Sequence, residues 1–528
     1  MHTKSAAGGL QRERELKLRF RPDDLALLEA SALILAPSRE GEPGAEVHHL
    51  ESVYFDTPDL DLARHGLELR VRRDAENEWV QTIKARWAAR GSGFFDRAEH
   101  ECPVAGLALD LDQLPKGLGF GWLRRKRIRS RLRPVFATRV ERRIYHLAGC
   151  AGGEIELAID VGKVSAGRRT TPLCEVELEA KGEEPDILFR LAEALSESVD
   201  LRPETRGKAD LGYALLRSVG ARPEKGSPVR MRLNSAKEEV FAEILETALR
   251  QIRSNERAIL ASEDPEGVHQ MRVALRRLRA CLSIFRDELP REAVEPVRES
   301  LRGILAVLGP ARDADVLLAN KLSPAKPGAG GDPVFAGILA LAEKDRAKAW
   351  AQVRKLLASR DYSRTILRLT GWIACRRWRA GMTGKELRRF QQPVGDMAET
   401  ALEKGHRRLL GVGENLARAD DAEWHHLRIA IKKQRYFIES FQDCFSAKSM
   451  GHYTEALASL QDRLGALQDL SIAETTFAKM ARGQPEPVTA FLRATVLWQA
   501  RERAWLRESV VQLWAEFAEL NRPWHDRR

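Results

Sequence analysis

Apolar and polar residues alternate through most of residues 13–179, so that every second side chain is apolar. A period of two is the pattern of a β-strand with one buried face. Helical spacing interrupts it at Asp23–Leu35, which an aspartate can cap, and at Pro185–Ser198, which has proline in its first turn. We therefore predict an α+β fold with an antiparallel sheet. The eight predicted strands are Arg12–Phe20, Val47–Phe55, Gly66–Arg73, Trp79–Arg86, Phe95–Pro103, Val135–Leu147, Glu154–Val161 and Leu173–Ala180.

Beyond residue 233 the apolar period lengthens to that of amphipathic helices. Turn-forming residues without periodicity precede this change and indicate a linker. The chain is thus predicted to have a first domain over 10–217, a linker over 218–234 and an all-helical domain over 235–515.

The helical part contains an internal repeat with an offset of 156 residues. Two separate blocks keep this register, so we predict two related halves that pack as a pseudo-symmetric bundle. Breaks between helices are expected at Pro290, at Pro310 and in the stretch Pro324–Pro333. The repeated residues are His269, Arg272, Val273, Ala274, Leu275, Arg276, Arg277, Arg279, Leu308, Gly309 and Asp313, matched by His425, Arg428, Ile429, Ala430, Ile431, Lys432, Lys433, Arg435, Leu464, Gly465 and Asp469.

Charged residues occupy every second position on three predicted strands, opposite the apolar face. Stacked carboxylates repel one another unless a cation neutralises them. Their hard oxygen ligands suit Mg²⁺ or Mn²⁺. A solvated face is the alternative for any one strand, but three such strands favour a metal site. The residues are Glu13, Glu15 and Lys17 on the first strand, Glu154, Glu156 and Asp160 on the seventh, and Glu175, Glu177 and Glu179 on the eighth.

Basic side chains on other strands complement these carboxylates. Arginine binds phosphate oxygens in a bidentate manner, and lysine adds a compact positive charge. Acidic and basic groups in one cavity predict a metal together with a phosphate chain. The basic residues are Arg70, Arg72, Lys84, Arg97, Arg142 and Lys208.

An ordered series of motifs over residues 10–217 resembles the CYTH family, whose members are also called triphosphate tunnel metalloenzymes. The series begins with Glu13-x-Glu15-x-Lys17. The motifs that follow, in order, are Tyr54-Phe-Asp-Thr57, Leu67-x-Leu-Arg-x-Arg72, Lys84, Arg97-x-Glu99, Phe136-x-Thr138-x-x-x-Arg142, Ile155-Glu-x-x-x-Asp160, Cys174-Glu-x-Glu-x-Glu179 and Lys208-x-x-x-Gly-Tyr213.

The resemblance implies an eight-stranded antiparallel tunnel barrel in which water attacks the terminal phosphoryl group of a triphosphate. Glu13 or Glu15, together with Lys208, is expected to orient that water. Arg139 competes with Arg142 for one position, because strand parity alone does not decide between them. The resemblance further implies metal binding by Glu13, Glu15, Asp160, Glu175, Glu177 and Glu179, and triphosphate binding by Lys17, Arg70, Arg72, Lys84, Arg97, Arg142 and Lys208.

Net charge separates the two parts of the chain. Residues 1–220 hold 35 Lys+Arg and 36 Asp+Glu, a net charge of −1. Subtracting these from the whole-chain totals of 87 and 76 leaves 52 and 40, so residues 221–528 carry a net charge of +12. The basic excess of the second part favours a polyanionic partner.

Two basic stripes occupy the repeated helices. Their spacing of i, i+3, i+7 and i+10 is continuous on a helix, and the duplication favours a surface for a long anion over an ordinary solvated face. Asp313 and Asp469 are expected to orient the basic groups. The first stripe is His269, Arg272, Arg276 and Arg279, and the second stripe is His425, Arg428, Lys432 and Arg435.

The helical part resembles the CHAD domain, a conserved-histidine α-helical domain that is often joined to a CYTH domain. The resemblance implies binding of inorganic polyphosphate and is compatible with an association with polyphosphate granules. Nucleic acid is the rival partner, because its backbone phosphates attract the same kind of surface. The sequence disfavours nucleic acid, since it has no recognition motif and no interleaved aromatic residues for base stacking.

No apolar run approaches the ~18 residues that span a bilayer. No leader is recognisable in Met1–Gly9, and the six cysteines form no Cys-x-x-Cys pair. We therefore expect a cytoplasmic protein without a membrane partner. The favoured function is metal-dependent hydrolysis of inorganic triphosphate. The alternatives are a class IV adenylate cyclase, a hydrolase of nucleoside or thiamine triphosphates, and a non-enzymatic polyphosphate-granule protein.

Overall fold

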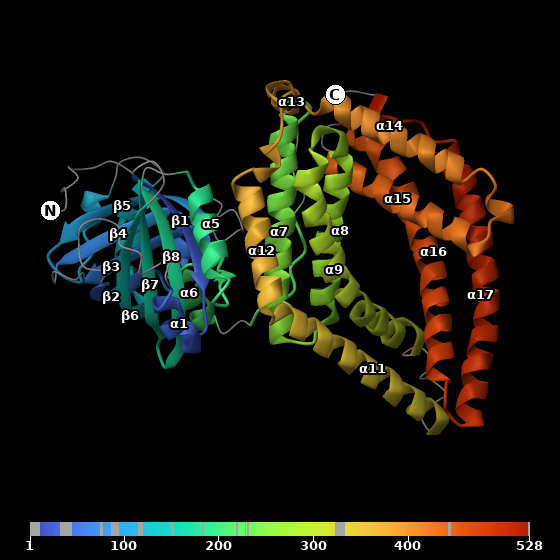
Figure 1. The fold of residues 1–528 in the computed structure, drawn as a ribbon, viewed down its shortest axis with the longest axis horizontal. Helices are drawn as coiled ribbons and strands as arrows, with labels where there is room; N and C mark the ends of the chain where they lie inside the picture. Colours follow the sequence, from blue (N-terminus) through green and yellow to red (C-terminus); the bar gives the residue numbers. More distant parts are fainter. Residues whose placement is uncertain are drawn as a thin grey trace. The chain divides into compact units, whose positions relative to one another are not determined.

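A computed structural model divides the chain into two compact units (Figure 1). The first unit comprises Met1–Ala221 and Ala358–Arg377, and the second comprises Arg222–Leu357 and Trp378–Arg528. Residues 358–377, which lie within the predicted helical range, belong to the first of these units. The residues that the structure describes are 11–31, 45–73, 78–85, 94–114, 120–148, 153–181, 184–217, 220–227, 229, 232–322, 333–441 and 445–525.

The eight predicted strands are all present in the first unit. β7 and β8 are longer than predicted, because they continue into a tight turn at Gly167, whose φ of 58° suits glycine. The strands are β1 (Gln11–Arg19), β2 (Glu46–Asp56), β3 (Leu67–Arg73), β4 (Trp79–Ala85), β5 (Phe94–Val104), β6 (Arg133–Ala148), β7 (Glu154–Ala166) and β8 (Arg169–Lys181), with a short β9 (Arg202–Pro203) added beside β1.

The strands form a closed antiparallel ring. Their order is β5-β4-β3-β2-β6-β7-β8-β1, and β1 pairs again with β5. One strand makes both contacts: Gln11 to Leu16 of β1 lie opposite β5, and Glu15 to Arg19 lie opposite β8. The predicted eight-stranded barrel is therefore confirmed.

Both faces of β1 are shielded from water, for different reasons. Leu16 and Leu18 are 0% exposed and belong to the apolar core between the sheet and α5 (Asp186–Leu195). Glu15 and Lys17 point the other way, yet they are only 4% and 3% exposed. Charged side chains stay this dry because the ring of strands encloses them.

Short helices surround the barrel. The predicted helix at residues 23–35 is shorter in the structure, where α1 follows a 3₁₀ turn. The expected aspartate cap is wrong, because Asp24 stands at the cap position without a side-chain hydrogen bond. Pro185 caps α5, close to the predicted start. The helices of this unit are α1 (Leu25–Glu29), α3 (Asp61–Arg64), α4 (Lys126–Arg129), α5, α6 (Lys208–Arg217) and α12 (Arg360–Ala374).

Helix α12 packs in the first unit although its sequence lies within the helical part. Leu367 is 0% exposed in the core cluster that also contains Phe189 of α5. A Cβ on Gly371 would come within 3.0 Å of the Phe189 ring, so the two helices are in close contact. Arg360 donates hydrogen bonds to the carbonyl oxygen of Ser196 at 3.0 and 2.8 Å. This helix is therefore part of the core beside the barrel.

The second unit is helical and shows the predicted repeat. In its described residues, α7, α8, α9 and α11 form one series of four long helices, and α14, α15, α16 and α17 form a second series. Helices α8 and α15 pack against each other. The helices are α7 (Lys237–Ala261), α8 (Pro265–Ile284), α9 (Arg291–Val316), α11 (Pro333–Leu357), α13 (Gly384–Phe390), α14 (Gly395–Val412), α15 (Asp421–Phe441), α16 (Ala447–Met480) and α17 (Glu486–Ala518).

The predicted break at Pro310 is wrong. Pro310 lies inside α9, which continues to Val316 and then into a π-helical turn. Leu308 and Ala311 on either side are 0% exposed, so packing outweighs the ~3 kcal/mol that an internal proline costs a helix. The break at Pro290 is confirmed, and most of the stretch Pro324–Pro333 lies outside the described residues. Among the helices that the structure describes, none is both long and apolar enough to cross a bilayer.

Replacing Leu367 with alanine should destabilise the first unit by about 2–5 kcal/mol, because the variant leaves a cavity in its core. The control is Arg368→Ala on the exposed side of α12, which should change the stability by no more than about 0.5 kcal/mol. Urea unfolding of the full chain, followed through hydrogen exchange of the α5 amides, measures both effects. Equal effects of the two substitutions would show that α12 is not part of this core.

Candidate functional site

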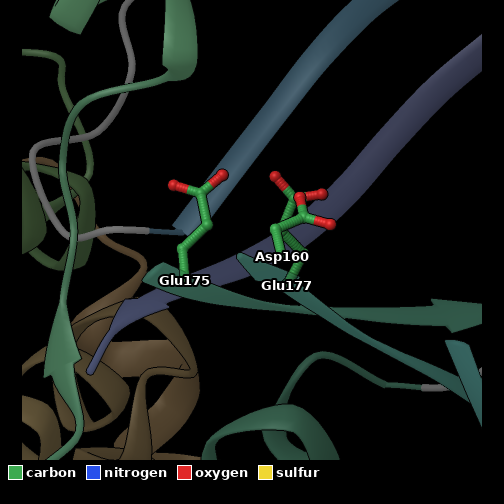
Figure 2. A group of neighbouring side chains, drawn as sticks. All are labelled: Asp160, Glu175 and Glu177. Carbon is green, nitrogen blue, oxygen red and sulfur yellow. The ribbon is translucent and has the colours of Figure 1, made fainter. Parts of the chain in front are cut away.

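Three carboxylates from two neighbouring strands form an acidic cluster inside the barrel. Asp160 lies directly opposite Glu175 in the β7–β8 register, and Glu177 follows two residues later on the same face. One carboxylate oxygen of each lies within 4.8 Å of the others, and Figure 2 shows the three groups projecting to the same side. Hard oxygen donors at this spacing fit a divalent cation such as Mg²⁺ or Mn²⁺.

Three cations contact the acidic cluster. Lys208 Nζ lies 2.7 Å from Asp160 and 2.8 Å from Glu177, and it also contacts Glu175. Arg142 donates two hydrogen bonds to Asp160, at 2.8 and 2.7 Å, and one to Glu177. Lys17 contacts Glu177 as well. Every carboxylate of the cluster is therefore compensated by positive charge.

Burial and charge act in opposite directions on these groups. Burial raises the pKa of Glu175 to about 7, although Lys208 and Lys17 counteract it. For Glu177 and Asp160 the nearby cations outweigh burial, and they hold the pKa of both carboxyls below its usual range. Burial alone would lower the pKa of Lys208, but the attraction of Asp160 and Glu175 raises it well above normal. The cluster thus keeps strongly interacting charges where water hardly reaches them.

Helix α6 positions Lys208, which is its first residue. Asp210 accepts a hydrogen bond from the Gly207 N–H at 2.8 Å and so fixes the helix start. The helix lies on the barrel because Gly212 has no side chain: a Cβ there would come within 2.2 Å of the Phe136 ring. The matching motif residue Tyr213 donates to Asp56, which is fully buried, at 2.9 Å. These contacts hold Lys208 over the acidic cluster.

A basic cluster on the neighbouring strands consists of Arg70, Arg72 and Lys84. Lys84 pairs with Glu99 at 3.0 Å, and Arg70 lies 3.8 Å from the same carboxylate. The Nε atoms of both arginines are buried and have no hydrogen-bond partner among the described residues. Such donors are suited to an anionic ligand.

Glu99 and Glu101 line the basic cluster, although neither was predicted as a site residue. Glu101 lies 3.6 Å from Arg72 and accepts a hydrogen bond from Thr82 at 2.9 Å. Burial opposes ionisation of Glu101, but Arg72 and Arg70 lower its pKa. The sequence itself indicates that these glutamates face the site, because both alternate with Arg97 along β5.

Of the other predicted residues, Glu15 lies 3.4 Å from Lys17, and Glu179 faces Glu15 in the β1–β8 register; neither belongs to the acidic cluster. Glu13 and Arg97 are paired in the β1–β5 register, but their side chains lie outside the described part of the structure.

The structure also separates Arg139 from Arg142. Arg139 is exposed and binds Glu51 at 2.8 Å. Arg142 lies opposite Asp160 in the β6–β7 register. Only Arg142 therefore reaches the acidic cluster.

The two basic stripes meet where α8 packs on α15. Burial and then the neighbouring Arg428, Arg276 and Arg272 lower the pKa of Lys432 to about 7, so cations from both stripes are close together. Burial and then Arg276 likewise lower the pKa of Arg272. The Nε atoms of Arg276, Arg428 and Arg435 are buried without a hydrogen-bond partner in the described residues. This concentration of cations favours an anionic ligand.

The two aspartates of the repeat act on these cations. Asp313 is close enough to offset part of the pKa lowering of Arg272 and Arg428, and Asp469 does so for Arg428 and Lys432. Gly309 leaves room beside α9 for Arg272, whose Nη1 donates to the Leu305 carbonyl oxygen at 3.3 Å.

Two outer members of the stripes are exposed, and the other two are partly buried. Arg279 is exposed, and Arg435 pairs with Glu439 at 3.1 Å. His425 is exposed and lies 2.8 Å from Gln468. Burial and then Arg312 lower the pKa of His269. The structure therefore concentrates positive charge at the middle of the stripes.

Comparisons with known proteins match two different families to the two parts of the chain. Residues 11–213 match the family model of the CYTH domain, and residues 243–478 match that of the CHAD domain. An inorganic triphosphatase from Haemophilus influenzae is 30% identical over 166 residues, which are 31% of this chain and 46% of that protein. The match thus spans less than half the length of that relative.

Two solved structures resemble single parts of the chain. The CHAD domain of the plant Ricinus communis is 28% identical, with a TM-score of 0.49, and covers 58% of this chain and 99% of that one. A candidate adenylyl cyclase from Hippeastrum with a dominant triphosphatase activity is 23% identical, with a TM-score of 0.29, and covers 39% and 95%. The two family matches follow each other in sequence and cover most of the chain, so this is a CYTH–CHAD protein, with a CYTH domain followed by a CHAD domain.

Proposed function

We propose that the CYTH barrel hydrolyses inorganic triphosphate with the help of Mg²⁺ or Mn²⁺. The observation that carries the proposal is the enclosed contact of the acidic cluster with Lys17, Arg142 and Lys208. Similarity to the Haemophilus influenzae inorganic triphosphatase supports the same substrate. An ordinary ion-pair network would not need buried, unpartnered arginine donors such as those of Arg70 and Arg72.

The cations that now contact the acidic cluster are suited to a second partner. A triphosphate would attract Lys17, Arg142 and Lys208 to its own oxygens, and a divalent cation would replace them beside the carboxylates. Metal and triphosphate should therefore bind as a pair, because either one alone leaves buried charge unbalanced. Asp160, Glu175 and Glu177 would hold the metal, with Glu13, Glu15 and Glu179 as further proposed ligands.

Phosphoryl transfer to water requires positioning and charge stabilisation more than covalent chemistry. Arg70, Arg72, Lys84 and Arg97 would hold one part of the phosphate chain, and Lys17, Arg142 and Lys208 the other. A bound divalent cation would supply further stabilisation of negative charge on the phosphate oxygens. Glu13 or Glu15, with Lys208, would orient the water. Its oxygen bonds to the terminal phosphorus while the bridging P–O bond breaks, which gives orthophosphate and pyrophosphate, and the released proton passes to a carboxylate and then to solvent.

We also propose that the CHAD domain binds inorganic polyphosphate along the two stripes, in the cytoplasm and in association with polyphosphate granules. The specific observation is that Arg272, Arg276, Arg428 and Lys432 lie close together with lowered pKa values or unpartnered donors. A chain of phosphates would offset this repulsion over its whole length. Nucleic acid is the alternative occupant.

The first test is a phosphate-release panel with triphosphate, thiamine triphosphate, ATP and long-chain polyphosphate. Release from triphosphate should be fastest, should stop with chelator, and should return with Mg²⁺ or Mn²⁺, because the acidic cluster offers only hard oxygen ligands. Equal rates on ATP, or cyclic AMP as the main product, would refute the assignment. Unchanged rates in chelator would refute the metal role.

A second test compares two arginines of the same strand. Arg142→Ala should lower kcat/KM for triphosphate by about 10²–10³, because one preorganised charged donor is lost from the site. Arg139→Ala removes an exposed arginine that contacts Glu51 and should leave kcat/KM unchanged. Steady-state kinetics, with circular dichroism as a folding check, measure both variants. Similar losses in both would contradict the proposed role of Arg142.

Polyphosphate binding by the full chain should weaken steeply with salt, because each phosphate contact releases condensed counterions. Arg276→Glu with Lys432→Glu should reduce affinity and flatten the dependence of log affinity on log salt. The control is Arg388→Glu with Arg482→Glu, which changes the net charge equally at exposed positions outside α8 and α15. Fluorescence anisotropy with labelled polyphosphate measures these affinities, with DNA and RNA as competitors at equal phosphate concentration. Tighter binding of nucleic acid, or equal loss in the control, would refute the proposal.

A further inference from the structure

The two helical halves differ at the position of one buried carboxylate, Asp315. In the first half, Asp315 on α9 is 4% exposed and accepts hydrogen bonds from two residues of α11: Arg346 Nε at 2.6 Å and Trp350 Nε1 at 3.1 Å. The repeat offset of 156 places Ser471 of α16 at the position that matches Asp315. The second half therefore lacks a carboxylate at this position, although Glu474 of α16 pairs with Arg503 of α17 elsewhere between its third and fourth helices.

A cavity of about 50 Å³ lies beside Ser471, between α15, α16 and α17. We call it the Ser471 cavity. One buried water needs about 10–15 Å³ on this measure, so the space suits three or four waters or the oxygens of one tetrahedral anion. The polar side chains around it include Ser471, His425, Arg428, Gln468, Arg503 and Arg507.

The Ser471 cavity is positively charged. Three arginines line it against a single carboxylate, that of Asp421. Arg507 contacts Asp421, and Arg503 pairs with Glu474 at 2.5 Å. The Nε atoms of Arg428 and Arg507 are nevertheless buried without a hydrogen-bond partner in the described part of the chain. Two unpartnered cationic donors beside one small cavity indicate a missing acceptor.

We propose that the Ser471 cavity binds one tetrahedral oxyanion of the phosphate class, which takes the place that the Asp315 carboxylate has in the first half. The anion would accept hydrogen bonds from Arg428 and Arg507 and would join α15 and α16 to α17. Arg428 also belongs to the second stripe, so the anion is either free orthophosphate or the terminal phosphoryl group of a bound chain. Binding of free orthophosphate does not depend on the proposed function of the CHAD domain. Only binding of the terminal phosphoryl group of a chain rests on the proposed polyphosphate binding.

Hydrogen exchange of the full chain tests the proposal with orthophosphate as the probe, at constant ionic strength against chloride. Amides at the start of α15 and in α17 around Arg503 and Arg507 should exchange about tenfold more slowly once phosphate is at roughly ten times its dissociation constant. This local readout separates the Ser471 cavity from the barrel, which also has sites for phosphate.

Two substitutions of Ser471 serve as a test and its matched control. Ser471→Asp introduces the carboxylate of the first half and should abolish the phosphate-dependent protection, whereas Ser471→Asn, of similar size and without charge, should keep it. Both should keep the helix content of the unsubstituted chain by circular dichroism, which confirms folding, and both should retain triphosphate turnover. Asp315→Ser should create phosphate-dependent protection in α9 and α11. Protection in Ser471→Asp equal to that of the unsubstituted chain would overturn the proposal, and so would the absence of protection in the unsubstituted chain with both orthophosphate and linear polyphosphate.

Two further probes identify the source of the anion. Linear polyphosphate has terminal phosphoryl groups, and cyclic trimetaphosphate has none. Protection by orthophosphate assigns the cavity to a free anion, and protection by linear but not cyclic polyphosphate assigns it to a chain end. Loss of polyphosphate binding in Arg276→Glu with Lys432→Glu tests the stripes separately. Absence of polyphosphate binding from the unsubstituted chain, with orthophosphate protection kept, would refute the proposed function of the CHAD domain but not the anion site.

Discussion

The need to compensate buried carboxylates governs the structure of the CYTH barrel. Asp160 and Glu175 are 0% and 2% exposed and lie opposite each other on adjacent strands. Isolated charges in such surroundings would be protonated or would destabilise the fold. The barrel instead brings Arg142 from β6 and Lys208 from α6 to the same place. The closed ring of strands, the short helix α6 and its glycine contact with β6 all serve this arrangement.

Much of this fold could be predicted from the sequence because a strand has a period of exactly two residues. That period assigns Leu16 and Leu18 to one face of the strand and Glu15 and Lys17 to the other, without reference to any partner strand. It could not decide between Arg139 and Arg142, because apolar residues fall on both faces of β6. The cross-strand partner decides, and it is Asp160 for Arg142 but Glu51 for Arg139. Register is set by distant segments, so local alternation does not contain it.

Helix packing was harder to predict, because it also depends on contacts with distant segments of the chain. The repeat of 156 residues revealed two related halves, because identical spacing survives in α8 and α15. Nothing in the amphipathic pattern of α12 shows that Leu367 packs with the core beside the barrel rather than with the other long helices. The expected helix break at Pro310 failed because buried neighbours outweigh the local preference of proline. The local sequence predicts which face of a helix is apolar, but not what covers it.

The two domains balance their charges in opposite ways, and this difference would determine how each binds the phosphates proposed for it. In the barrel, Glu177 contacts Lys17 and Arg142, so the proposed triphosphate would have to exchange partners and would benefit from a divalent cation binding with it. In the CHAD domain, Arg276 and Lys432 repel each other, and Asp469 offsets only part of that repulsion. The polyphosphate proposed there would therefore meet net positive charge among the described residues and would not depend on a metal to offset carboxylates. Enclosed charges are screened little by salt, whereas charges near the surface are screened strongly. Under the proposed functions, the chain would hold a compact anion with metal in the barrel and an extended anion without metal on its helices.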